Sequence, residues 1–165
     1  MTAAAWEVHS QSVAETLALG RRIGAAARPG DVVALVGDLG SGKTHLAKGI
    51  AEGLGAARAH DVTSPTFIIC HEYLDGRMPF YHLDAYRLHG SADLEAIGAD
   101  EMLEGDGLAA LEWADRAPEA LPDDRLDVRL EVTGAETRRI ALAPHGPRAE
   151  RLLAAVRRAA GEAAR

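Results

Sequence analysis

The chain has 165 residues, of which 47% are hydrophobic and 26% charged, and its formal net charge at pH 7 is −7. This length is enough for one compact domain and short for two, so we expect a single domain over residues 1–165. A chain with this negative charge is poorly suited to hold a nucleic-acid backbone unaided. The single cysteine excludes an internal disulfide, and the lack of a secretory signal or a bilayer-spanning apolar run predicts a soluble, cytoplasmic protein without membrane contact.

The first predicted element is a helix over residues 12–27. Ser12 and Glu15 have the spacing of a capping box, and the Pro-Gly pair at 29–30 ends the helix. The apolar side chains on one face are Val13, Leu17 and Ile23. This modest stripe is typical of a helix that packs on a sheet.

A buried strand and a glycine-rich loop come next. Residues 32–36 (VVALV) form a continuous apolar run, as expected for a strand buried on both faces of a parallel sheet. Residues 37–44 (GDLGSGKT) match the phosphate-binding P-loop pattern G-x-x-x-x-G-K-[ST], and residues 43–54 have a helical pattern that Gly55 closes. Because the strand and the helix flank the loop as the motif requires, we predict a nucleoside-triphosphate site and not a plain turn.

The residue types in this loop explain the chemistry. A glycine-rich turn lets backbone N–H groups point at phosphate oxygens, and the following helix adds its positive N-terminus. Lys43 reaches the outer phosphates, and Thr44 offers its hydroxyl to Mg²⁺. Lys43 and Lys48 are the only lysines among 18 basic residues, as expected if a compact ammonium is kept for a phosphate. The predicted nucleotide-binding residues are Asp38, Leu39, Gly40, Ser41, Gly42, Lys43 and Thr44.

Residues 61–67 (DVTSPTF) predict a loop, because Pro65 imposes an extended or turn geometry among hydroxyl side chains. P-loop proteins commonly place a threonine that senses the γ-phosphate after the first helix. Thr66 is therefore a candidate switch residue, with an ordinary loop as the alternative. Cys70, in an apolar run, is expected to be a buried and inert thiol.

Three further strands are predicted, and two of them end in an acid. Residues 67–74 and 79–84 read as a hairpin joined across Asp75-Gly76, which places an antiparallel pair beside the parallel sheet. Residues 107–113 (GLAALEW) form a more continuous apolar run. The acids at these strand ends are Asp84 and Glu112.

A P-loop protein needs a carboxylate at the edge of a neighbouring strand to hold Mg²⁺ or its waters and to orient the attacking water. Asp84 and Glu112 are both candidates, and the more buried strand favours Glu112. The common alternative for either is a solvated strand-end acid. His82 and Asp84 share a strand face, but we reject a zinc site because no Cys or His cluster accompanies them.

The rest of the chain predicts a broken helix over 91–103, a short turn over 117–121 and a hairpin of strands 126–132 and 138–143. Residues 147–165 predict a basic amphipathic helix with five Arg and two Glu. The fold class that follows is α/β and P-loop NTPase-like, with a mostly parallel sheet flanked by helices and antiparallel hairpin additions.

Four motifs, taken in order, are similar to those of the TsaE (YjeE) family of small P-loop ATPases. They are residues 37–44, residues 64–67 (SPTF), residues 82–88 (HLDAYRL) and residues 111–113 (LEW). The resemblance extends from about residue 10 to about residue 144. The first motif alone is generic, whereas the four together are specific.

This resemblance implies a role in bacterial tRNA modification, in which a threonylcarbamoyl group is attached to the adenosine 3′ of the anticodon. It implies ATP or ADP and Mg²⁺ as ligands, and TsaB and TsaD as partner subunits. TsaD carries out the transfer in that family, the TsaE-type ATPase is needed for repeated turnover, and tRNA is reached only through the partners.

The resemblance also implies roles for individual residues. The implied catalytic residues are Lys43, Thr66 as the switch threonine, Asp84 as the Walker-B-like acid, and Glu112. The implied metal ligands are Thr44, Asp84 and Glu112, and Trp113 joins the nucleotide-binding residues as part of a late acid–aromatic pair. His45 departs from the family pattern, since many relatives have a second threonine there, but it leaves the P-loop intact.

Other functional classes fit the sequence less well. A GTPase is excluded because the chain contains no Asn for an N-K-x-D motif and no D-x-x-G after the P-loop. A small-molecule kinase is the main enzyme alternative, in which Arg87 or Arg116 would bind an acceptor phosphate, although no Arg-rich lid is visible. A nucleotide-sensing interaction module with vestigial hydrolysis is the third possibility.

Overall fold

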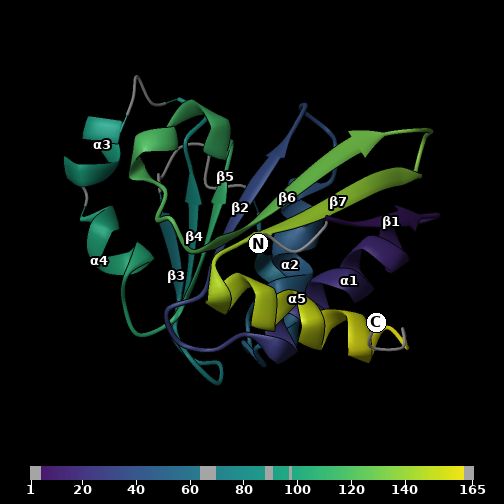
Figure 1. The fold of residues 1–165 in the computed structure, drawn as a ribbon, viewed down its shortest axis with the longest axis horizontal. Helices are drawn as coiled ribbons and strands as arrows, with labels where there is room; N and C mark the ends of the chain where they lie inside the picture. The colour runs from purple at the N-terminus through teal and green to yellow at the C-terminus, as the bar shows by residue number, and fades with distance from the viewer. Residues whose placement is uncertain (1–4, 64–69, 88–90, 97, 162–165) are drawn as a thin grey trace.

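The computed structural model describes residues 5–63, 70–87, 91–96 and 98–161, and within them a seven-stranded sheet has helices on both faces (Figure 1). The strands are β1 Trp6–Ser10, β2 Val32–Gly37, β3 Cys70–Tyr73, β4 Phe80–Asp84, β5 Leu108–Glu112, β6 Arg125–Val132 and β7 Arg138–His145. The helices are α1 Val13–Ala26, α2 Lys43–Gly53, α3 Ser91–Ala96, α4 Ala99–Leu103 and α5 Pro147–Ala159. The short 3₁₀ helices are η1 Ala59–Asp61, η2 Ala114–Arg116 and η3 Pro118–Ala120.

The strand order across the sheet is β1-β7-β6-β2-β5-β4-β3. The central strands β6, β2, β5 and β4 are mutually parallel. Strand β3 is antiparallel to β4 at one edge, and β7 and β1 are antiparallel additions at the other. The predicted α/β fold class, with a parallel centre and antiparallel hairpins, is therefore confirmed. Strand β1, which pairs with β7, is an element that the sequence patterns did not predict.

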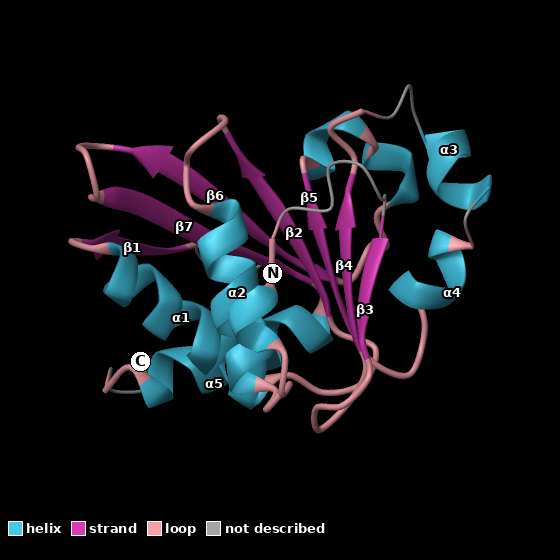
Figure 2. Cartoon of the chain, turned by 180° about the vertical axis from the view of Figure 1, so that it is seen from behind, coloured by secondary structure: helices cyan, strands magenta, loops and turns pink. Residues whose placement is uncertain are grey.

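Each face of the sheet is covered by its own set of helices. Helices α1, α2 and α5 pack on one face (Figure 2), and their apolar side chains form the larger core. Residues of α3, α4 and η2 pack with a second, smaller core on the opposite face. Alternate residues of β2 belong to the two cores, with Leu35 in the larger and Ala34 in the smaller. The strand before the P-loop is thus buried on both faces, as its continuous apolar run predicts.

The helix ends follow the sequence signals. The Ser12 side chain accepts a hydrogen bond from the Glu15 N–H at 3.2 Å, which confirms the cap at the start of α1. At the start of α5 the N–H groups of Arg148 and Ala149 both donate to the Asp124 carboxylate at 3.0 Å. An acid at a helix N-terminus satisfies amides that have no partner within the helix. None of the helices in the described part of the chain has the length and apolar character needed to cross a membrane.

Candidate functional site

Three parallel strands end at the same edge of the sheet, at the top of Figure 1. The P-loop follows β2, Asp84 ends β4 and Glu112 ends β5. A pocket of about 230 Å³ lies at this edge. Its lining residues are Leu39, Gly40, Ser41, Gly42, Lys43, Thr44, His45, Asp84, Tyr86, Glu112 and Trp113. The structure therefore brings together most of the site residues predicted from the sequence.

The path of the P-loop depends on its glycines. A Cβ atom at Gly37 would lie 2.5 Å from the Ser41 Oγ and 2.6 Å from the Leu130 carbonyl oxygen, which is too close for any side chain. Gly42 has φ +102°, in the left-handed region that glycine adopts most readily. Within the loop, the Ser41 N–H donates to the Asp38 carbonyl at 3.0 Å. The chain can therefore turn sharply from β2 into α2 and bring its backbone close to a ligand.

The Lys43 ammonium lies inside this loop with a side chain that is only 4% exposed. It donates to the carbonyl oxygens of Gly37 at 2.7 Å and Asp38 at 2.9 Å. Its Nζ also lies 4.0 Å from the centroid of the Trp113 ring. Burial lowers the pKa of Lys43, and the negative charges of Glu112 and Asp84 oppose that shift. An ammonium held mainly by neutral carbonyl groups favours an anionic ligand such as a phosphate.

The two predicted acids are buried and hydrogen-bonded instead of solvated. Glu112 is 2% exposed, and the Thr44 Oγ1 lies 3.3 and 3.4 Å from its two carboxylate oxygens. The His82 Nε2 lies 2.5 Å from Glu112 Oε2. Asp84 is 4% exposed, and its Oδ1 accepts a hydrogen bond from the Tyr86 N–H at 2.7 Å. Carboxylates are buried in this way only where partners or ligands compensate for the lost hydration.

The chemistry of this donor set fits a hard cation. The Thr44 hydroxyl and the carboxylates of Glu112 and Asp84 supply oxygen atoms, the ligands that Mg²⁺ prefers. His82 is instead fully buried against Glu112, and no partner for its Nδ1 is found among the described residues. The sequence places His82 on the same strand face as Asp84, but its contact with Glu112 on the neighbouring strand was not predicted.

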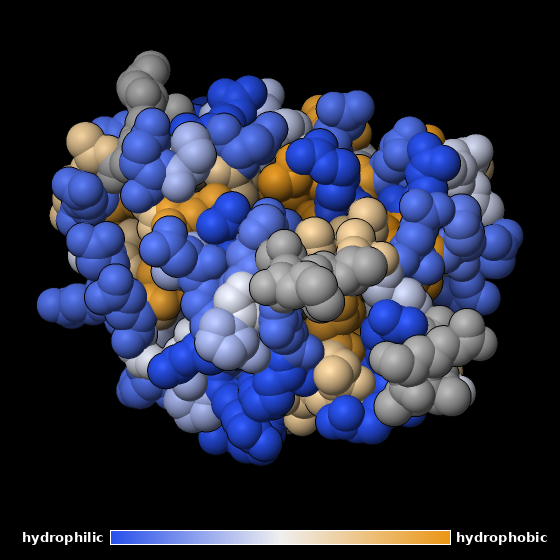
Figure 3. All heavy atoms as spheres, in the orientation of Figure 1, coloured by the Kyte–Doolittle hydropathy of each residue, from blue (hydrophilic) through white to orange (hydrophobic). Residues whose placement is uncertain are grey.

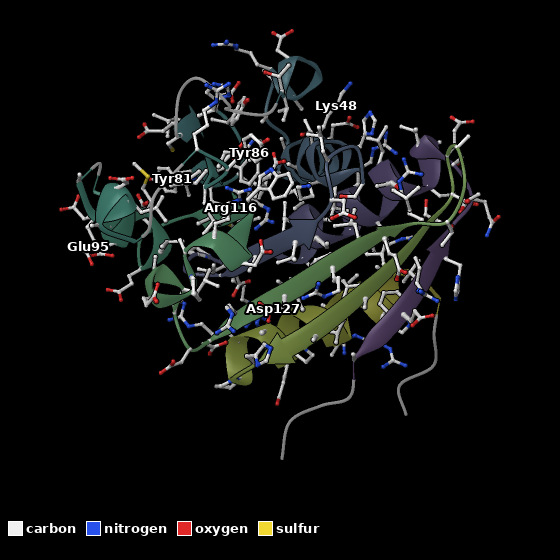
Figure 4. All side chains as sticks on the ribbon, turned by 90° about the horizontal axis from the view of Figure 1, so that it is seen from above. Lys48, Tyr81, Tyr86, Glu95, Arg116 and Asp127 are labelled. Atoms are coloured by element: carbon white, nitrogen blue, oxygen red, sulfur yellow. The ribbon has the colours of Figure 1, made fainter. Side chains whose placement is uncertain are left out.

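Aromatic side chains form one wall at the mouth of the pocket. Trp113 has a positive φ of 57°, which is uncommon for a residue other than glycine, and this turn follows directly after Glu112. The centres of the Trp113 and Tyr86 rings are 4.9 Å apart. The Arg116 guanidinium lies 4.8 Å from the centre of the Tyr86 ring and donates to the Tyr86 carbonyl at 2.9 Å (Figure 4). Arg116, a candidate acceptor-phosphate ligand in the kinase alternative, is thus engaged in this wall.

The remaining predicted residues have different positions. Asp38 contributes its backbone carbonyl to Lys43, and the Leu39 side chain is 81% exposed. Thr66 lies outside the described residues. Cys70 is partly buried, and burial raises the pKa of its thiol to about 12, as expected for an inert cysteine. Tyr86 lines the pocket although its sequence context gave no signal beyond the motif that contains it.

A second hollow, of about 320 Å³, lies on the sheet face turned away from α1 and α2. It is lined by small apolar residues such as Ala34, Val36 and Ala141, together with charged residues such as Arg125 and Asp127. Figure 3 shows apolar surface between hydrophilic side chains on the face that it presents. No P-loop residue lines this hollow. The residues of the predicted phosphate site line the smaller pocket at the strand ends instead.

Known proteins resemble this chain over most of its length. The family model described as threonylcarbamoyl adenosine biosynthesis protein TsaE matches residues 10–140. A Bacillus subtilis protein named tRNA threonylcarbamoyladenosine biosynthesis protein TsaE is 45% identical over 138 residues, which cover 84% of this chain and 85% of the relative. A Streptomyces coelicolor protein of the same name is 43% identical over 122 residues, which cover 72% of this chain and 80% of the relative. The crystal structure of Bacillus subtilis YdiB has a TM-score of 0.81 and 37% identity, with 97% of this chain and 98% of that chain covered.

Proposed function

Because the chain belongs to the TsaE family of tRNA threonylcarbamoyladenosine biosynthesis proteins, we propose that it is the ATP-binding and ATP-hydrolysing subunit of that system. One observation carries the proposal. The pocket at the strand ends combines a P-loop lysine with two buried carboxylates, Asp84 and Glu112. ATP, ADP and Mg²⁺ are the proposed ligands, and the cytoplasm, where tRNA is modified, is the proposed location.

Each residue has a proposed role in hydrolysis. Lys43 binds the outer phosphates of ATP, and Thr44, Asp84 and Glu112 hold Mg²⁺ directly or through water. Mg²⁺, when bound, neutralises charge on the phosphates. A carboxylate orients the water whose oxygen attacks the γ-phosphorus as the bond to the ADP oxygen breaks. Support comes from the contact of Glu112 with both Thr44 and His82, which fixes the direction of this carboxylate.

We infer further that the nucleotide state controls binding to partner subunits of the TsaB and TsaD type. The net charge of −7 supports indirect contact with tRNA through those partners. Thr66 and its loop are the proposed sensor of the γ-phosphate. A tenfold preference of the partners for the ATP state requires a differential interaction of only about 1.4 kcal/mol, which one or two hydrogen bonds supply.

A phosphate-release assay tests the hydrolysis proposal against its alternatives. The chain is assayed alone, with TsaB and TsaD, and with a panel of small acceptor metabolites. Release that the partners stimulate, without transfer to an acceptor, is the expected result. Phosphoryl transfer to a metabolite would support the kinase alternative. ATP binding without release under any condition would support a sensing module.

The switch proposal is tested by partner affinity. Binding to TsaB and TsaD is measured with a non-hydrolysable ATP analogue and with ADP, for the parent and for Thr66→Ala. We expect tighter binding in the ATP state and a smaller preference in the variant. Equal affinities of the parent in both states would exclude the switch. A preference that is unchanged in Thr66→Ala would remove only Thr66 from the mechanism.

A further inference from the structure

Arg138, the first residue of β7, connects the C-terminal hairpin to the P-loop. Its Nε donates to the Ser41 carbonyl at 2.9 Å, and its Nη2 donates to the Gly40 carbonyl at 3.0 Å. Its Nη1 donates to the carbonyls of Gly134 at 3.0 Å and Thr137 at 2.8 Å, in the turn between β6 and β7. Arg138 lies 97 residues from Ser41 and 98 residues from Gly40 in the sequence, so one guanidinium joins two distant segments of the chain.

The carbonyls that Arg138 holds determine where the loop N–H groups point. In a trans peptide the C=O and the next N–H point in opposite directions. Fixing the Ser41 carbonyl on Arg138 therefore directs the Gly42 N–H to the other side of the peptide. Fixing the Gly40 carbonyl likewise directs the Ser41 N–H, which donates to the Asp38 carbonyl at 3.0 Å. These two hydrogen bonds, called the Arg138 clamp below, thus act on the consecutive peptide groups Gly40–Ser41 and Ser41–Gly42 in the P-loop.

A loop with glycines needs such an external contact more than an ordinary loop does. Gly40 and Gly42 both have positive φ values, and glycine loses more conformational freedom on ordering than any other residue. An arginine is suited to this task because its planar guanidinium presents several donors in a fixed arrangement and stays charged. Its positive charge also lies beside a loop that we propose binds phosphates.

We propose that Arg138 is a positioning residue that holds the P-loop in its phosphate-binding conformation before nucleotide arrives. The C-terminal hairpin then contributes to ATP affinity although it supplies no residue that lines the pocket. The effect on ATP affinity depends on the proposed function of the pocket. The effect on the loop conformation does not, and it can be measured without any ligand.

The neighbouring arginine provides a matched control. Arg139 has the same chemistry, but its Nη2 donates to the Glu131 carboxylate at 2.6 Å on the exposed side of the hairpin. Arg139→Gln therefore removes one arginine and one ion pair from the same strand without touching the P-loop contacts. Arg138→Lys is the conservative variant, since a lysine keeps the charge but loses the two-pronged geometry.

Two measurements on four proteins test the proposal. Amide hydrogen exchange over residues 38–44 is measured without nucleotide, and ATP affinity is measured by calorimetry with Mg²⁺, for the parent, Arg138→Gln, Arg138→Lys and Arg139→Gln. We expect faster exchange in the loop of Arg138→Gln and an affinity roughly tenfold lower. Arg138→Lys should be intermediate in both, and Arg139→Gln should match the parent.

Unchanged loop exchange in Arg138→Gln would overturn the proposal, as would an equal effect of Arg139→Gln. If thermal unfolding shows that Arg138→Gln does not fold, Arg138→Lys decides the matter: exchange and affinity equal to those of the parent would then overturn the clamp. A parent that does not bind ATP would refute the proposed function, whereas the exchange measurement would still test the clamp.

Discussion

Four titratable side chains at one edge of the sheet are almost completely buried: Lys43, His82, Asp84 and Glu112. Burying charged groups costs free energy unless partners compensate. Their partners here include carbonyl groups, a threonine hydroxyl and the Tyr86 N–H, and His82 and Glu112 contact each other. Such clusters are typical of sites that bind or transform a charged ligand.

We expect Asp84→Ala and Glu112→Ala to lower phosphate release by roughly 10²-fold or more, while ATP affinity changes less than about tenfold. Both carboxylates are assigned to Mg²⁺ and water, whose interactions are strongest in the transition state. Phosphate release in the presence of the partners and calorimetry with ATP give the two quantities. The exposed Glu101 in α4 provides the control variant Glu101→Ala, and thermal unfolding shows whether each variant folds. Hydrolysis at the parental rate in one variant would make that acid a structural residue.

The Cys70 thiol should react slowly with alkylating reagents in the native protein. Burial raises its pKa from 9.0 to about 12, so the reactive thiolate at pH 8 is roughly 10³-fold rarer than in the unfolded chain. Between pH 9 and about pH 12 the native protein keeps the thiol proton, whereas the unfolded chain loses it. The resulting contribution to stability is complete below pH 9 and is lost as the pH rises towards 12.

Iodoacetamide labelling followed by mass spectrometry tests this expectation, and the chain has no other cysteine to confuse the result. Labelling is compared at pH 8 in buffer and in denaturant. Similar rates in the two conditions would mean that the thiol is accessible and ionisable in the native protein.

Elements with a strong local pattern were predicted correctly from the sequence. The capped helix α1, the buried strand β2, the helix α2 and both hairpins all agree with the structure. Strand β1 was missed because it is a five-residue edge strand whose partner in the described part of the chain, β7, is more than a hundred residues away. Local periodicity also could not predict that β6 pairs in parallel with β2, which makes β2 a central strand of the sheet.

The site residues divide in the same way, into those that local spacing predicts and those that depend on contacts between distant strands. The P-loop and the strand-end acids follow from spacing within single elements, and the structure brings them into one pocket. The contacts of His82 with Glu112 and of Arg138 with the P-loop depend on how separate strands align. A sequence pattern gives the face on which a residue lies but not the neighbour that it meets across the sheet.

At the scale of the whole molecule, the basic C-terminal helix α5 packs against the larger core. Its apolar face is buried in the larger core, and Arg151 donates to the buried Asp31 carboxylate at 2.8 Å. Burial raises the pKa of Asp31, and the charge of Arg151 opposes this shift. At least one of the basic side chains of this helix therefore forms an ion pair with a buried acid.

The P-loop edge exposes an apolar side chain beside the pocket. The loop presents Leu39, which is 81% exposed, next to a pocket with Tyr86 and Trp113 in its wall. In the proposed ATP site the phosphates bind to backbone groups and Lys43, so the exposed leucine is not needed for them. Leu39 is therefore available for contact with a partner protein beside the pocket.

Calorimetric titration of ATP in the presence of Mg²⁺ into the parent, Lys43→Ala and Lys48→Ala tests the central claim most directly. Lys48 lies on the same helix but does not line the pocket. Loss of the charge-assisted phosphate contact in Lys43→Ala should cost about 1.5 to 3 kcal/mol, roughly a ten- to hundred-fold loss of affinity, with an unchanged unfolding temperature. Lys48→Ala should bind ATP as the parent does. Parental affinity in Lys43→Ala, or no binding to the parent at all, would contradict an ATP site in this loop.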